Sequence, residues 1–227
     1  MKGGLPLCVI TSDYGAMTVE HVQILFQVIV FLFAISVHES AHAWMAWRLG
    51  DPTARMLGRV SLNPIRHVDP IGTVLLPALA LFYHFPMIGW AKPTPVDPRN
   101  FQHPMRDDIL TSVAGPASNF LIATVSILAL RFLALFGHAA SLSEPLALLL
   151  WLSMGINVLL GVFNLIPVPP LDGSHVLRHL LPESIRRIYD MAGMFGLLLL
   201  FVVGGPAIRF FSDIIQTFLI NMFLRGI

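Results

Sequence analysis

The sequence predicts an all-α protein that crosses a membrane several times. Of its 227 residues, 56% are hydrophobic and only 12% are charged, and the mean hydropathy is +0.75. So few charges cannot coat the surface of a soluble domain of this size. Several apolar runs reach the roughly 20 residues that an α-helix needs to cross the hydrocarbon core of a bilayer. Together these observations predict a polytopic bundle of about five to six membrane segments.

The composition also restricts the classes of function. The formal net charge is +1, and no basic run with interleaved aromatic residues is present, so we expect no nucleic-acid partner. Cys8 is the single cysteine, which leaves no disulfide framework and no thiolate metal site. A bound metal ion would therefore be held by His, Asp or Glu. We expect residues 1–20 to be a short N-terminal segment, with Met17 as an alternative start, and residues 21–227 to be one membrane-embedded domain.

The first predicted span covers residues 22–47 and contains His-Glu-Ser-Ala-His at residues 38–42. On a helix, His38 and His42 lie at i and i+4, one above the other on a single face. Both imidazoles can then reach one tetrahedral zinc ion, and Glu39 beside them can act on a water molecule. The alternative is a set of buried polar residues that tie helices together. We favour a metal site, because ionisable groups inside a membrane span are costly and usually mark function.

The chain between the first span and the next full span is rich in prolines. Residues 71–90 form an apolar run that Pro77, Pro86 and Gly89 interrupt. Four prolines between residues 93 and 104 forbid a regular helix, so we expect that segment to be extended. Non-helical backbone is allowed at membrane depth only where protein or a water-filled cavity surrounds it. We therefore expect residues 71–90 to form a re-entrant or hairpin element, with a full span as the alternative.

Two further spans are predicted at residues 109–136 and 145–165, and a last apolar region covers residues 191–223. The second span begins with small residues around Gly115, which favour close packing against another helix. A Gly-Gly-Pro sequence at residues 204–206 interrupts the last region. That region forms either one kinked helix or two shorter helices.

The basic residues predict the orientation of the chain. Seven of the 14 Lys and Arg residues lie between Arg48 and Arg106, and three more follow the third span. By the positive-inside rule, both regions are cytoplasmic. The residues between the first and second full spans must then cross the membrane an even number of times. With an even number of crossings, the third span ends on the cytoplasmic face of the membrane. The first span, with His42, ends on the same face.

Asp172 is the candidate third ligand, because a catalytic zinc usually has three protein ligands and one open position. It lies in Asn-Leu-Ile-Pro-Val-Pro-Pro-Leu-Asp-Gly, residues 164–173, where we expect Gly173 to give the backbone the freedom to aim it. The alternative is a helix N-cap, since Asp-Gly-Ser before an apolar helix is a good cap signal. The predicted orientation and the two histidines of the first span favour a ligand.

A second histidine pair, His175 and His179, also has i, i+4 spacing and could form a further metal site with Asp172. This pair has no glutamate at the corresponding position and lies near basic residues. We therefore favour a role other than metal binding for it.

Three separated parts of the sequence resemble the site-2 proteases, the intramembrane zinc metalloproteases of peptidase family M50. They are His-Glu-Ser-Ala-His at residues 38–42, Ala-Gly-Pro-Ala-Ser-Asn at residues 114–119, and the proline-rich sequence at residues 164–173. The resemblance is to a compact form, and we expect no PDZ or CBS regulatory domain.

This resemblance implies that one Zn²⁺ ion per chain binds to His38, His42 and Asp172. It also implies that Glu39 is the general base and that Asn164 lies near the reacting peptide. The Asn164 amide could donate a hydrogen bond to the developing oxyanion. A helix-terminal hydrogen bond is the alternative for Asn164.

The implied function is hydrolysis of peptide bonds in a single-pass transmembrane protein or peptide, within the cell membrane and towards its cytoplasmic side. Two alternatives are a catalytically inactive scaffold of protease shape and, less favoured, a transporter. A transporter would show paired halves with interrupted helices at matching positions, and the sequence shows no such symmetry. An inactive scaffold would lack Glu39 or a ligand, and all are present. The substrate and the oligomeric state cannot be read from the sequence.

Overall fold

The fold is described from a computed structural model, which defines residues 19–76, 79, 82, 90–136 and 143–224. Within these residues the chain is helical and contains no strand, which confirms the predicted all-α class. The α-helices are α1 (Val19–Arg48), α2 (Thr53–Met56), α4 (Pro104–Phe136), α5 (Ser143–Asn164), α6 (Asp172–Leu180), α7 (Glu183–Val203) and α8 (Gly205–Phe223). Three short turns of helix also occur, η1 (Pro64–Arg66), η2 (Pro70–Leu75) and η3 (Pro98–Asn100).

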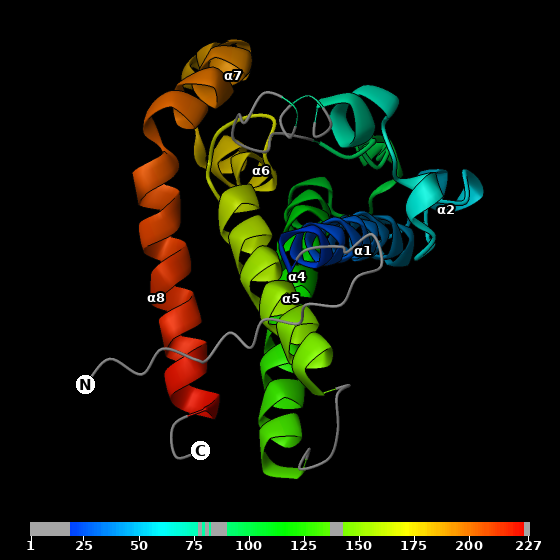
Figure 1. Cartoon of the computed structure of the whole chain (residues 1–227). Coiled ribbons are helices and arrows are strands. Elements are labelled where there is room, and N and C mark those ends of the chain that lie inside the picture. Colours follow the sequence, from blue (N-terminus) through cyan, green and yellow to red (C-terminus); the bar gives the residue numbers. More distant parts are fainter. Residues whose placement is uncertain (1–18, 77–78, 80–81, 83–89, 137–142, 225–227) are drawn as a thin grey trace.

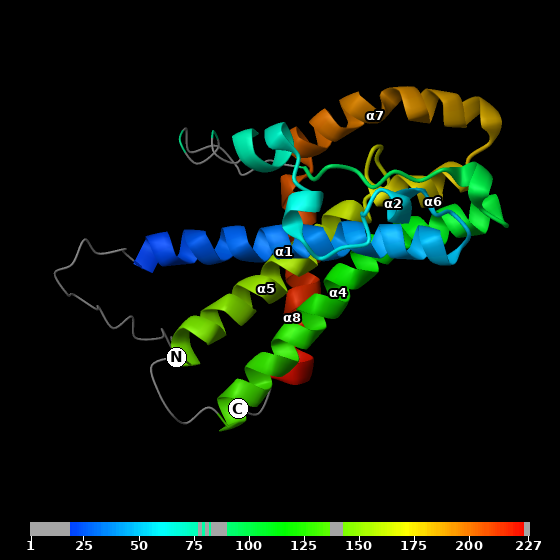
Figure 2. The ribbon, with the colours of Figure 1, turned by 90° about the vertical axis from the view of Figure 1, so that its right-hand side faces the viewer.

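The long helices form a bundle in which α4 and α5 pack most extensively against each other (Figure 1). Helix α1 crosses this pair and packs against both helices, as Figure 2 shows from the side. Helix α8 packs against α5 and α4, and the short α6 packs against α4. Two segments distant in sequence, α1 and α6, are therefore brought to the same helix, α4.

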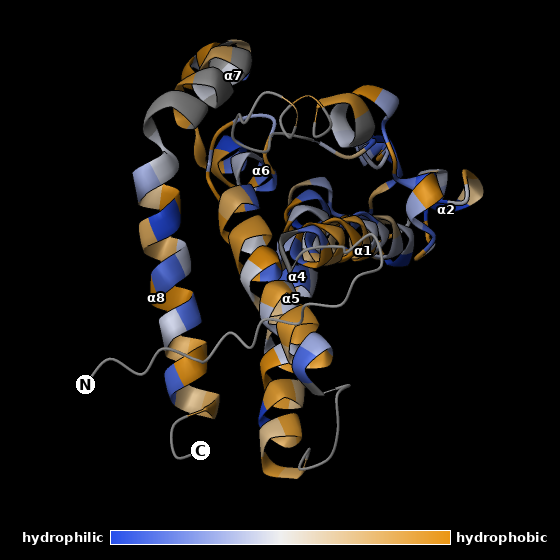
Figure 3. Ribbon diagram, viewed as in Figure 1, coloured by the Kyte–Doolittle hydropathy of each residue, from blue (hydrophilic) through white to orange (hydrophobic). Residues whose placement is uncertain are grey.

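Three of these helices, α1, α4 and α5, are long and apolar enough to cross a membrane. They correspond to the first, second and third predicted spans. Many large apolar side chains on them face outward, including Phe33 on α1, Phe132 on α4 and Trp151 on α5. Hydrophobic residues predominate on α5 and on the last part of α4, whereas α6 is largely hydrophilic (Figure 3). Outward apolar faces on long helices are what a bilayer requires.

The buried apolar cluster lies where α4, α5 and α8 meet. It consists of Ala123, Ile127, Met154, Val158, Val162 and Leu219. Ile127, Met154 and Val158 are fully enclosed. This packing fixes α5 against the second half of α4, and the first half of α4 is the part that contacts the histidines of α1.

The last apolar region is two helices and not one kinked helix. Helix α7 ends at Val203, and α8 begins at Gly205. Pro206 lies in the first turn of α8, where its missing N–H costs no helical hydrogen bond. The alternative of two shorter helices is therefore confirmed for this region.

Much of the predicted re-entrant element at residues 71–90 lies outside the described residues. Its two ends are defined, and they meet. The backbone N–H of Trp90 donates to the carbonyl of Gly72 at 3.2 Å, and the Thr73 hydroxyl donates to the carbonyl of Trp90 at 2.7 Å. The chain thus leaves from Gly72 and returns beside it, as a hairpin would.

The proline-rich residues 90–97 form no helix, as their sequence predicts. Side chains from the region after α1 hold this segment in place. The Arg59 guanidinium donates to the carbonyls of Lys92 and Pro93, and the buried Asp51 carboxylate accepts from the backbone N–H of Asp97 at 2.8 Å. The segment is thereby attached to the end of α1.

Asp51 is fully buried and accepts further hydrogen bonds from Thr53 and Asn100. Burial alone raises the pKa of Asp51, but these hydrogen bonds and the one from Asp97 outweigh it and hold the pKa below its ordinary value. The ionised carboxylate is therefore the form that the fold requires.

We expect Asp51→Asn to lower the free energy of unfolding by about 1.5–3 kcal/mol, the usual contribution of a hydrogen bond to a charged group. The new amide would place an N–H against one of the donors that Asp51 now accepts. Thermal melting of the purified protein in detergent measures the effect. The matched control is Asp97→Asn, because Asp97 pairs with the exposed Arg99, and such surface pairs stabilise little. Equal melting temperatures for the two variants would contradict the anchoring role of Asp51.

Candidate metal centre

Three predicted ligands meet between α1 and the first residue of α6. The Nε2 atoms of His38 and His42 are 3.0 Å apart. The Oδ2 atom of Asp172 lies 3.1 Å from His38 Nε2 and 3.4 Å from His42 Nε2. Within the part of the chain that the structure describes, no other three His, Cys, Asp or Glu side chains have ligand atoms all within 4.8 Å of one another. This group could hold a metal ion.

The spacing of these atoms is close to that around tetrahedral zinc, with one distance inside the expected range and two slightly shorter. Zinc bonds of about 2.0–2.2 Å at tetrahedral angles place neighbouring ligand atoms roughly 3.3–3.6 Å apart. Asp172 Oδ2 is buried and, although close to both imidazoles, makes no hydrogen bond of acceptable geometry. A buried carboxylate oxygen requires a partner to replace its lost hydration. One cation in contact with all three atoms would satisfy this oxygen.

The protonation of Asp172 suits the same role. Burial raises the pKa of the Asp172 carboxyl, but the two imidazoles beside it, first that of His42 and then that of His38, lower it by more. The net result is a pKa below the ordinary value. Asp172 is therefore an ionised carboxylate, the form that binds a cation.

The tautomer of His42 is set by the backbone of α4. His42 Nδ1 lies 2.7 Å from the carbonyl oxygen of Thr111, which can only accept a hydrogen bond. Nδ1 therefore carries the hydrogen, and the lone pair of neutral His42 is on Nε2, facing the other ligands. A backbone or carboxylate partner on the second nitrogen is the usual arrangement for a metal-binding histidine.

His38 is oriented by a chain of buried amides. The Ser153 carbonyl accepts from Asn157 Nδ2 at 2.9 Å, which leaves Asn157 Oδ1 to accept from Asn119 Nδ2 at 2.8 Å. Asn119 Oδ1 then faces His38 Nδ1 at 2.6 Å and accepts its hydrogen. Since the Ser153 carbonyl can only accept, every hydrogen bond in this series has a defined donor and acceptor. His38 Nδ1 therefore carries the hydrogen, and the lone pair of His38 Nε2 faces the cluster.

Sequence reasoning gave no role to Asn119 or Asn157 individually. Both are fully buried in the apolar helices α4 and α5. Their position in predicted membrane spans could have indicated a role, because a strongly polar side chain in such a span is expected to have a hydrogen-bond partner. What the sequence did not show is which residue that partner would be.

Gly115 permits α4 to approach the two histidines. A Cβ atom at this position would lie 2.3 Å from His42 Nε2 and 2.7 Å from His38 Cε1. The predicted close packing is confirmed, and it occurs at the predicted ligands themselves. Any larger residue here would displace an imidazole.

Glu39 is held by the extended segment. Its Oε2 atom accepts a hydrogen bond of 2.7 Å from the Thr94 hydroxyl, which also lies 3.1 Å from the Glu39 carbonyl oxygen. The contact joins the residue between the two histidines to residues 90–97. The attachment of that segment through Asp51 and Arg59 therefore positions the carboxylate of Glu39 as well.

The N-cap alternative for Asp172 and the expectation for Gly173 both differ from the structure. Asp172 is not an N-cap, because Leu171 occupies that position and no side chain caps α6. Gly173 does not serve to give backbone freedom, since it is helical and the described glycines with positive φ are Gly50 and Gly58. A Cβ at Gly173 would lie 2.2 Å from the Leu165 carbonyl oxygen, so the glycine provides space.

The remaining candidates lie elsewhere. Asn164 Nδ2 donates to the carbonyl of Leu160 at 3.0 Å, which is the helix-terminal hydrogen bond given as its alternative. Its role at the oxyanion stays a prediction. His175 and His179 contact Asp108 and do not join Asp172 in a second cluster.

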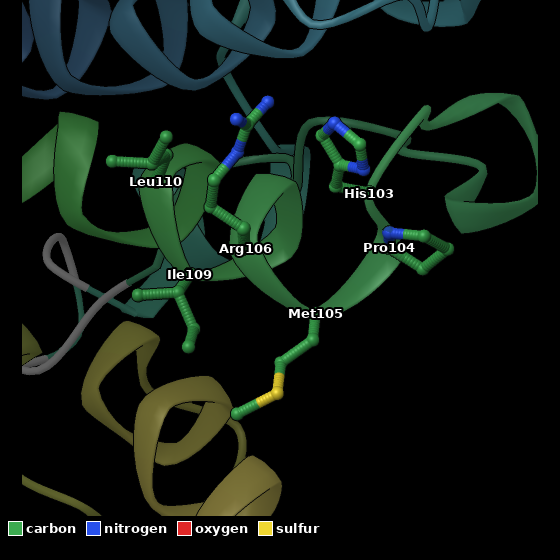
Figure 4. A pocket seen from close by; sticks show the side chains of 6 residues that line it. All are labelled: His103, Pro104, Met105, Arg106, Ile109 and Leu110. Carbon is green, nitrogen blue, oxygen red and sulfur yellow. The ribbon is translucent and has the colours of Figure 1, made fainter.

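A pocket of about 510 Å³ lies at the start of α4 (Figure 4). It is lined by His103, Pro104, Met105, Arg106, Ile109 and Leu110. None of these residues is a predicted ligand or base, so the pocket does not include the metal cluster.

Comparison with known proteins identifies the family. Residues 132–203 match the model of peptidase family M50, a range that contains Asp172 but not the two histidines. The chain is 36% identical over 180 residues to the "Putative zinc metalloprotease YwhC" of Bacillus subtilis, covering 78% of this chain and 79% of the relative. No solved structure gives a significant match.

Two further relatives carry the name "Putative zinc metalloprotease Rip2". The one from Mycolicibacterium smegmatis is 28% identical over 197 residues, which is 83% of this chain and 70% of the relative. The one from Mycobacterium tuberculosis strain H37Rv is 29% identical over 190 residues, which is 76% and 64%. By these matches the chain belongs to peptidase family M50, a family of zinc metalloproteases.

Proposed function

We propose that this metalloprotease cleaves peptide bonds of single-pass transmembrane proteins or peptides within the membrane. The observation that carries the proposal is the position of the three candidate ligands. His38 and His42 are buried in α1, a helix able to span a bilayer, and Asp172 meets them from α6. A hydrolytic site built on such a helix can reach a bond inside the membrane.

One Zn²⁺ ion would be held by His38, His42 and Asp172, the three side chains whose ligand atoms converge. When bound, zinc supplies a Lewis acid that activates water and polarises the scissile carbonyl. The buried amides and the Thr111 carbonyl keep both imidazoles in the ligating tautomer.

Glu39 is the general base in this proposal. Thr94 holds one carboxylate oxygen, Oε2, and the other oxygen is available to accept the proton of the attacking water. The protonated Glu39 then delivers that proton to the leaving amine. Asn164 is the predicted donor to the oxyanion, and only one of its two amide hydrogens is used at Leu160.

The substrate must be unwound before attack, because helical amides are inaccessible. Residues 90–97 lie beside Glu39 through Thr94 and have no helical structure. The backbone groups of Thr94 and Val96, between the positions bonded to Arg59 and Asp51, can therefore pair with an extended substrate strand. We place the site towards the cytoplasmic side of the cell membrane, from the distribution of Lys and Arg. The hairpin at residues 71–90 and helices α7 and α8 would complete five to six membrane segments.

Glu39→Gln tests this assignment. We expect the purified variant to keep one zinc ion per chain and to lose cleavage of a transmembrane peptide by about 10²–10⁴-fold, the usual contribution of a general base. Metal analysis and a cleavage assay in detergent or vesicles measure the two quantities separately. The comparison variant Asp172→Asn should bind zinc more weakly and lose cleavage as well.

The outcomes separate the competing functions. Wild-type protein that binds zinc but never cleaves would indicate an inactive scaffold. Cleavage by Glu39→Gln at the wild-type rate would refute the mechanism given above. Solute movement across vesicles without peptide cleavage would indicate a transporter.

Thr94→Val should reduce kcat roughly tenfold, since it removes a hydrogen bond to a carboxylate worth about 1.5 kcal/mol without changing the size of the side chain. Zinc content should not change, because Thr94 contacts Glu39 and none of the three ligands. Thr94→Ser keeps the hydroxyl and should restore most of the activity. A valine variant as fast as the wild type would show that the hydrogen bond from Thr94 does not support Glu39.

A further inference from the structure

A second polar cluster joins α4 to α6 outside the proposed zinc site. The Asp108 carboxylate, on the second turn of α4, is buried. His175 Nδ1 lies 3.2 Å from both of its oxygens, and His179 Nε2 lies 2.8 Å from Oδ2. The two histidines are one turn apart on the same face of α6. Asp108 therefore holds α6 at two points.

The same turn of α4 also holds α1. Thr111, three residues after Asp108, accepts the hydrogen bond from His42 Nδ1 through its carbonyl. Three residues of helix correspond to a rise of about 4.5 Å. A single turn of α4 thus contacts both His42 and α6, the helix that begins with Asp172.

Helix α6 depends on such contacts for its position. It has nine residues, fewer than an isolated helix needs to be stable, and no side chain caps its N-terminus. Asp172 lies one turn before His175, so a rotation or shift of α6 would move the carboxylate away from the imidazoles. The hydrogen bond to Asp108 raises the pKa of His175, which favours a charged pair at this contact.

We propose that Asp108 is a positioning residue, which places Asp172 at the zinc through its contacts with His175 and His179. The proposal rests on the zinc site of the proposed function. A second metal site at Asp108 is less well supported, because in the described residues only the His38, His42 and Asp172 cluster has ligand atoms all within 4.8 Å of one another.

The test is the zinc affinity of the full-length protein in detergent, measured by competition with a chelator. Asp108→Asn keeps the shape of the side chain but replaces one accepting oxygen with a donor. We expect it to weaken zinc binding about 10–100-fold, as is usual when a residue supporting a metal ligand is lost. Arg178→Gln is the matched control, because Arg178 lies on the same helix and pairs with Asp190 instead. It should leave the affinity unchanged.

A double-mutant cycle distinguishes positioning from a general loss of structure. In the Asp172→Asn background, Asp108→Asn should change the remaining affinity less than about threefold, because the ligand that it positions is already gone. The absorption bands of the cobalt-substituted protein should show the same change of coordination in Asp108→Asn as in Asp172→Asn. If Asp108→Asn fails to fold, His175→Gln and His179→Gln each remove one contact and should each give part of the loss.

Several results would overturn the proposal. They are an unchanged affinity in Asp108→Asn, an equal loss of affinity in both backgrounds, and two zinc ions in the wild type that fall to one in Asp108→Asn. A wild type that binds zinc but cleaves no peptide would refute the proposed function alone. In that case the affinity measurements would still decide the role of Asp108.

Discussion

The structure depends on one electrostatic requirement, which is that two imidazole nitrogens and a carboxylate oxygen lie within 3.0–3.4 Å of one another away from water. Such a group is stable only with a cation or a proton between its members. Its surroundings are built to keep the lone pairs converging. The Thr111 carbonyl and the Asn119 amide hold the far side of each ring, and Gly115 lets α4 come close enough to do so.

The bundle separates apolar packing from polar placement. The second half of α4 contributes Ala123 and Ile127 to the buried apolar cluster, and its first half carries the contacts to the candidate ligands and to α6. A rigid apolar core along one half of the helix gives precise positions along the other half, because packed helices resist displacement. The buried amides Asn119 and Asn157 connect the two regions. Through their hydrogen bonds, a backbone carbonyl of α5 fixes the orientation of the His38 ring.

Helix α4 is therefore central to this fold, whereas the sequence pointed to α1. The residues with recognisable chemistry, His38, Glu39 and His42, are all on α1. The groups that orient them come from α4, α5 and the segment at residues 90–97. An extended segment held by Arg59 and Asp51 is as much a part of the site as a helix, because it carries the hydroxyl that contacts Glu39.

By itself, the sequence determined the helical membrane class, the three spans and the candidate ligands, because hydropathy over 20 residues and i, i+4 spacing are local properties. The meeting of Asp172 with His38 was predicted by counting membrane crossings, which uses charge alone. Only the tertiary structure decided the partners of Asn119 and Asp108 and the steric need for Gly173. These are contacts between residues 8 to 81 positions apart, and no local pattern specifies which buried polar group will face which.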